Sequence, residues 1–135
     1  MATISVTHLH GNRFLATTRN HPVLVDQPGD DIAPTPVELC VMALASCAAH
    51  YAVGYLRAEG LCDRGVTVEC RWSMRPNPAR VGRVEIAVRT PQPLTDKHRC
   101  GLLAAVDHCT VHNTLRLPPD IDVRVTDGAS LAGSR

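Results

Sequence analysis

The spacing of hydrophobic and polar residues changes several times along the first third of the chain. Residues 4–8, 13–18 and 21–26 are short alternating or apolar stretches separated by turn residues. This pattern is typical of short strands that pair with one another. Residues 27–36 are dense in proline, glycine and aspartate, which predicts a loop.

An uncharged run from Leu39 to Leu56 predicts a long helix that is buried on all sides in a soluble core. Thr35 is a suitable N-cap, Pro36 fits the first helical position, and Glu38 lies in the first turn. Gly60 is expected to end the helix. The run has about the minimum length of a membrane span, but it is rich in small residues and lacks flanking aromatic or basic belts. We therefore expect no membrane insertion.

The second half of the chain predicts a hairpin, a helix and a last strand. Residues 65–74 and 83–90 alternate cleanly, with Val, Cys, Trp and Met side chains of the first stretch on one buried face. A second helix is expected at 95–108, where apolar residues recur at helical spacing, and a final strand at 121–125.

The predicted order β-β-β-α-β-β-α-β indicates the α+β class, with two central helices packed on an antiparallel sheet. A length of 135 residues suits one domain. We place this single domain at residues 1–127 and predict a disordered tail at residues 128–135.

Composition excludes some classes of function. The formal net charge is +1 and aromatic residues make up 3% of the chain, so it has neither the basic surface nor the stacking platforms of nucleic-acid-binding proteins. The first residues do not resemble a secretory signal, so we expect a cytoplasmic protein. In that compartment the six cysteines should be reduced.

Two cysteines are candidates for chemistry. Cys47 lies in the middle of the long apolar helix, with His50 on a shared face, and Cys109 lies on the apolar stripe of the second helix. If the helices pack together, the two thiols can form a reversible disulfide, which is the minimum apparatus for thiol redox chemistry. A small buried thiol that only packs is the alternative for each. We expect the remaining four cysteines to have packing roles only: Cys40, Cys62, Cys70 and Cys100. Of these, Cys62 follows a helix end and is expected to be exposed.

Zinc binding is a competing interpretation. Cys47 with His50 and Cys109 with His112 form two Cys-x-x-His pairs, and His108 is a spare ligand. Structural zinc sites usually take their ligands from loops, however, so we expect no metal. A Cys-His hydrolase is disfavoured because no motif supplies an orienting group or an oxyanion hole.

The segment PTPVELCVMALASCAAHYAVGYLRAEGL (34–61), followed by CTVHNTL (109–115), resembles the OsmC/Ohr family of thiol-dependent hydroperoxide reductases, and the OsmC-like branch most closely. The shared pattern is a Pro-x-Glu-Leu helix start, a cysteine nine positions after the glutamate, and a later Cys-Thr-Val-x-Asn-Thr-Leu. Glu38 and Cys47 have this spacing. The resemblance extends over nearly the whole chain.

The resemblance implies an OsmC-like fold in an intertwined homodimer, with active sites at the subunit interface. It implies that Cys47 attacks a hydroperoxide, often an organic one, and that Cys109 resolves the sulfenic acid as a disulfide. A dithiol would then reduce the disulfide, with no metal or organic cofactor, in defence against oxidative stress.

This chain departs from the family pattern in one respect. Members with strong organic hydroperoxide activity pair an arginine with a glutamate at the position of Val37. Arg13 and Arg19 are the candidate cations, and Glu38, His50 and His112 are further supporting residues. A cation matters because an apolar environment raises the pKa of a thiol. The alternative function is a catalytically weak protein that holds an apolar ligand at the dimer interface.

Overall fold

The computed structural model describes residues 1–128 of the chain, so the predicted tail at residues 128–135 lies almost entirely outside the described residues. The elements are, in order, β1 (Ser5–His10), β2 (Arg13–Thr18), β3 (His21–Val25), α1 (Pro36–Ala58), β4 (Thr67–Arg75), β5 (Arg80–Arg89), α2 (Asp96–Asp107) and α3 (Thr110–Arg116).

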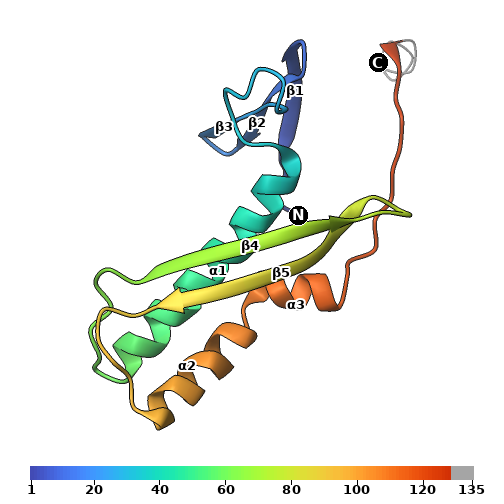
Figure 1. Ribbon diagram of the computed structural model, residues 1–135. Helices are drawn as coiled ribbons and strands as arrows, with labels where there is room; N and C mark the ends of the chain where they lie inside the picture. The colour runs from blue at the N-terminus through green and yellow to red at the C-terminus, as the bar shows by residue number, and fades with distance from the viewer. Residues whose placement is uncertain (129–135) are drawn as a thin grey trace.

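The strands form two separate antiparallel sheets, one of order β1-β2-β3 and one of β4 and β5. Figure 1 shows the first sheet beyond the N-terminal end of α1. The long β4–β5 hairpin crosses α1, and α2 and α3 lie next to β5. Helices and antiparallel strands thus occupy separate parts of the chain, which confirms the α+β class.

The long helix begins and ends where its sequence predicts. The Thr35 hydroxyl accepts the backbone N–H of Glu38 at 3.1 Å, and the Glu38 carboxylate accepts the N–H of Thr35 at 2.9 Å. This reciprocal pair is a capping box, and Pro36 follows it in the first turn. At the other end Gly60 adopts a φ of +67°, a left-handed conformation that glycine takes without steric cost.

The prediction that α1 is buried on all sides is wrong for this chain. Its buried residues form a single stripe at helical spacing: Val41, Leu44, Ala48, Ala52 and Leu56. The opposite face is open, with Met42 54% exposed, because the hairpin and α2 cover only one side. By length and composition α1 is the one helix among the described residues that is able to cross a membrane, a test that core helices of soluble proteins also pass.

The predicted last strand has no partner among the described residues. Residues 121–125 are extended and continue away from the helices toward the C-terminus (Figure 1). Ile121, Val123 and Val125 are 79%, 84% and 90% exposed. A strand needs a neighbouring backbone for its hydrogen bonds, and neither sheet of this chain reaches the segment.

The end of the second predicted helix also differs. α2 ends at Asp107, and Cys109 becomes the N-cap of a separate helix, α3, that begins at Thr110. In the hairpin, Val68 and Cys70 are half-buried as predicted, but Trp72 and Met74 are exposed. Figure 1 shows that this part of β4 extends past α1, so no helix covers it.

Candidate active site

The fold brings the sulfur atoms of Cys47 and Cys109 together. Cys47 lies in the middle of α1, and Cys109 lies at the start of α3, where 1% of its surface is exposed. The two side chains are hydrogen-bonded to each other, and neither is in a disulfide. The sequence prediction that the two cysteines meet is therefore consistent with the geometry, although Cys109 is placed by a helix cap and not by the stripe of α2.

Backbone groups at the start of α3 set the ionisation of Cys47. Burial raises the pKa of the Cys47 thiol, but three donors oppose this effect: the backbone N–H of Val111, the Cys109 thiol and the backbone N–H of Thr110. Their combined effect is larger, so the pKa of Cys47 lies below its ordinary value. Among the described residues, the groups that lower the pKa of Cys47 are hydrogen-bond donors, and none of them is a cation.

The pKa of Cys109 is shifted in the opposite direction, above its ordinary value. Burial raises the pKa of its thiol, and the N–H of His112, which reaches the Cys109 sulfur at 3.5 Å, only partly offsets it. The hydrogen bond to Cys47 and the charge of that thiolate raise the pKa of Cys109 further. Of the two sulfurs, Cys47 therefore ionises first, and Cys109 stays protonated and donates to it.

The break between α2 and α3 positions Cys109. The N–H of Cys109 donates to the carbonyl of Val106 at 3.2 Å, which closes the last turn of α2. Its own carbonyl accepts the N–H of Asn113 at 3.0 Å, which opens α3. The backbone donors at Thr110 and Val111 were missed by the sequence prediction, because cysteine is not among the preferred N-cap residues and gives no signal of a helix start.

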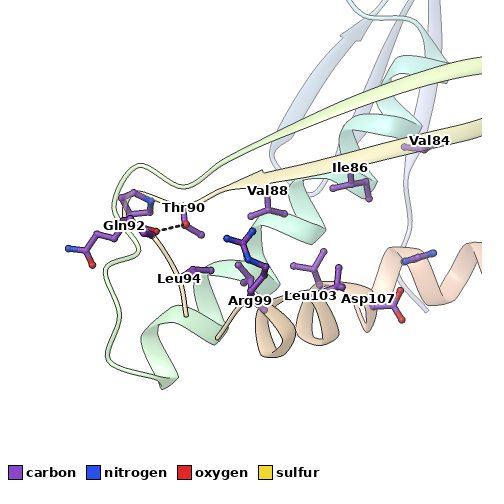
Figure 2. A pocket seen from close by; sticks show the side chains of 14 residues that line it. Val84, Ile86, Val88, Thr90, Gln92, Leu94, Arg99, Leu103 and Asp107 are labelled. Carbon is purple, nitrogen blue, oxygen red and sulfur yellow. Dashed lines mark hydrogen bonds between the residues drawn. The ribbon is translucent and has the colours of Figure 1, made fainter. Parts of the chain in front are cut away.

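A groove of about 840 Å³ lies between β5 and α2, and neither Cys47 nor Cys109 is among its lining residues. Figure 2 shows Val84, Ile86 and Val88 along β5, on the opposite side of the groove from Leu103 of α2. Arg99 lies closer to Thr90, at the other end of the groove from Val84. Two lining residues also bond to Cys109: Val106 through its carbonyl and His112 through its N–H. The groove therefore shares two residues with the immediate surroundings of Cys109.

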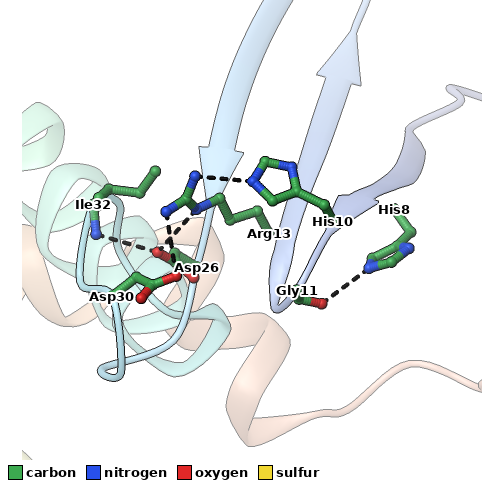
Figure 3. Close-up of polar contacts among 7 residues, drawn as sticks. All are labelled: His8, His10, Gly11, Arg13, Asp26, Asp30 and Ile32. Atoms are coloured by element: carbon green, nitrogen blue, oxygen red, sulfur yellow. Dashed lines mark hydrogen bonds and ion pairs between the residues drawn. The ribbon is translucent and has the colours of Figure 1, made fainter.

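Arg13 is bound in a cluster of its own (Figure 3). Its guanidinium lies 3.7 Å from the Asp26 carboxylate and 3.2 Å from Asp30, and donates to the His10 ring at 3.1 Å. Asp26 is 1% exposed and requires a positive partner. Arg19 lies in the β2–β3 turn, where its φ is +51°. Within the described part of the chain, neither arginine is among the groups that set the pKa of Cys47.

The other predicted supporting residues have local roles. The Glu38 carboxylate belongs to the capping box of α1, and the exposed His50 ring packs edge-on against Tyr51. Among residues 1–128 no group of three or more His, Cys, Asp or Glu side chains is placed to hold a metal ion. Of the cysteines expected to pack, Cys40 and Cys100 are exposed, and Cys62 is exposed as predicted.

A scan against protein-family models matches residues 29–124 to the family described as OsmC-like protein. The chain belongs to the OsmC-like protein family. The match covers both cysteines, both helices that hold them and the whole β4–β5 hairpin. The resemblance found in the sequence motifs is thereby confirmed. None of the curated proteins compared with the chain matches it.

Solved structures share this OsmC-like fold. A Psychrobacter arcticus protein, described as belonging to the osmotic stress induced and detoxification response, is 28% identical with a TM-score of 0.78, over 84% of this chain and 88% of that one. An OsmC-like protein of Mycoplasma pneumoniae is 16% identical with a TM-score of 0.76, over 86% and 87%. The organic hydroperoxide resistance protein OhrB of Bacillus subtilis is 15% identical with a TM-score of 0.65, over 89% and 93%.

Proposed function

We propose that this chain is a cysteine-based peroxidase that reduces hydroperoxides, with Cys47 as the attacking thiolate and Cys109 as the resolving thiol. The observation that carries the proposal is the contact between two free thiols from different helices, Cys47 in the middle of α1 and the buried Cys109 at the start of α3. Membership of the family and the hydroperoxide resistance named for the Bacillus subtilis neighbour support a role in peroxide stress.

The chemistry follows from the two protonation states. The Cys47 thiolate attacks the outer oxygen of ROOH, the O–O bond breaks, and the alkoxide leaves as ROH after it takes up a proton. Cys47 is then a sulfenic acid, in contact with the Cys109 sulfur. Cys109 attacks the Cys47 sulfur, a disulfide forms, and water is released. A dithiol reductant then reduces this disulfide to the two thiols and is itself oxidised to a disulfide.

The groove supports an organic substrate. Its walls are largely aliphatic, and it ends at residues that bond to Cys109. An alkyl or aryl group in this groove loses contact with water, which favours binding. Hydrogen peroxide has no such group, so we expect a preference for organic hydroperoxides.

A second copy of the chain is proposed as the partner. A lone chain leaves apolar surfaces and strand edges in contact with water. These are the open face of α1, strand β1, which is exposed along its whole length, and the unpaired segment at residues 121–125. A homodimer covers them. Light scattering should give twice the chain mass, and the parent remaining a monomer at all concentrations contradicts this proposal.

We assign the catalytic cycle to the cytoplasm. A reducing compartment keeps thiols free and holds a dithiol reductant, as the proposed cycle requires.

Peroxide consumption by the reduced protein tests the function. With a dithiol present, we expect cumene hydroperoxide to be consumed faster than hydrogen peroxide, Cys47→Ser to abolish consumption, and the exposed-cysteine control Cys62→Ser to leave it unchanged. Equal consumption by Cys47→Ser and the parent contradicts the assignment. No consumption by the parent favours the alternative of a binding protein.

A further inference from the structure

A tyrosine on α1 connects this helix to the start of α3. Tyr51 lies one turn after Cys47, and its hydroxyl is 2.8 Å from the hydroxyl of Thr110. Thr110 is the first residue of α3 and directly follows Cys109. The contact joins residues that are 59 positions apart in sequence.

α3 has little apolar packing to hold it in place, since none of its residues is buried. Polar contacts join it to the end of α2: Arg116 binds the Asp107 carboxylate at 2.6 Å, and the Asn113 amide donates to the carbonyl of His108 at 3.3 Å. Among the described residues, the Tyr51 contact is the one side-chain hydrogen bond between α1 and α3 apart from those of the sulfurs.

We propose that Tyr51, through Thr110, is a positioning residue that holds the start of α3 against α1, where its backbone N–H groups reach the Cys47 sulfur. The catalytic meaning of this inference rests on the proposed function, but the positioning itself does not. Thr110 supplies both ends of the link, because its hydroxyl meets Tyr51 and its N–H is one of the donors to Cys47.

The expected effect concerns the reactivity of one thiol. Without the tether the start of α3 is free to move away from α1, and the N–H groups of Thr110 and Val111 lose their alignment with the sulfur. Hydrogen bonds weaken steeply with distance and angle. A shift of about half to one unit in the pKa of Cys47 lowers its thiolate fraction near neutral pH by about threefold to tenfold.

The pH dependence of Cys47 alkylation by iodoacetamide, followed by tandem mass spectrometry that separates Cys47 from Cys40, is the test. In Tyr51→Phe and in Thr110→Val we expect the rate near neutral pH to fall by about threefold to tenfold, with the midpoint moved to higher pH. The double variant should show no further change, because each substitution breaks the same bond. Thr110→Ser keeps the hydroxyl and should restore the parental midpoint.

Tyr55→Phe is the matched control. Tyr55 is also on α1, one turn further along, and its hydroxyl is 3.3 Å from the His98 ring on α2, away from the sulfurs. It should leave the Cys47 midpoint unchanged. An unchanged midpoint in Tyr51→Phe, or an equal shift in Tyr55→Phe, overturns the proposal. A shifted midpoint in a protein that consumes no peroxide supports the positioning and contradicts only the peroxidase.

Discussion

Replacement of Cys109 by alanine tests the proposed division of labour between the two thiols. The Cys109 S–H is one of three groups that lower the pKa of Cys47, and Cys109 itself is 1% exposed, so water does not readily replace the lost donor. Hydrogen bonds to charged groups contribute roughly 1.5–3 kcal/mol, and a thiol is a weak donor, so we take about 1 kcal/mol. This energy corresponds to a rise of about 0.7 in the pKa of Cys47 and about fivefold less thiolate near neutral pH.

The assay is the alkylation rate of Cys47 by iodoacetamide as a function of pH. Cys109→Ala should shift the midpoint upward by about 0.7. Cys109→Ser keeps a hydroxyl donor and should shift it less, and Cys100→Ala, at an exposed cysteine, should leave it unchanged. A midpoint in Cys109→Ala at or below the parental one refutes the reasoning, because the Cys109 thiol would then not stabilise the Cys47 thiolate.

Three further predictions concern stability. Gly101→Ala places a methyl group against the Tyr55 hydroxyl and should cost roughly 1–3 kcal/mol in denaturant unfolding, whereas Gly54→Ala, with open space at its Cβ, should not destabilise the protein. Thr35→Ala removes the α1 cap and should cost about 0.5–2 kcal/mol by the same measurement. Hydrogen bonds from the backbone, chiefly from the next residue, hold the pKa of Asp26 below its ordinary value of 3.8, so its stabilisation is complete above that pH and is lost as the pH falls through the lowered pKa. Asp26→Asn should therefore flatten the acid side of the stability curve, and an equally steep curve contradicts this explanation.

Local signals predicted most of the fold. The Thr35 and Gly60 ends of α1 depend on side chains and backbone conformations within a few residues, so the sequence alone specifies them. The segment at 121–125 alternates correctly for a strand, yet pairing needs a second backbone, and none of residues 1–128 pairs with it. The prediction that α1 is buried on all sides failed for the same reason. The apolar pattern of the helix does not specify whether another element of the same chain packs on its second face.

The contact between Cys47 and Cys109 was predictable from the sequence, but the groups that lower the pKa of Cys47 were not. The motif around Cys47 and Cys109 indicated a thiol pair, and the structure places the two side chains in contact. The source of thiolate stabilisation was expected to be Arg13 or Arg19. Arg13 instead neutralises the buried Asp26, a partnership between distant residues that no local pattern reveals. Backbone N–H groups at Thr110 and Val111 lower the pKa of Cys47 in this chain, and backbone donors have no sequence signature.

The most direct test of the central claim is the fate of the two thiols after one turnover. The fully reduced protein is treated with one equivalent of cumene hydroperoxide in the absence of reductant, and its peptides are mapped by mass spectrometry. The account predicts a disulfide between Cys47 and Cys109, with the exposed Cys40, Cys62 and Cys100 still reduced. An intact Cys47, or oxidation confined to the exposed cysteines, would contradict it.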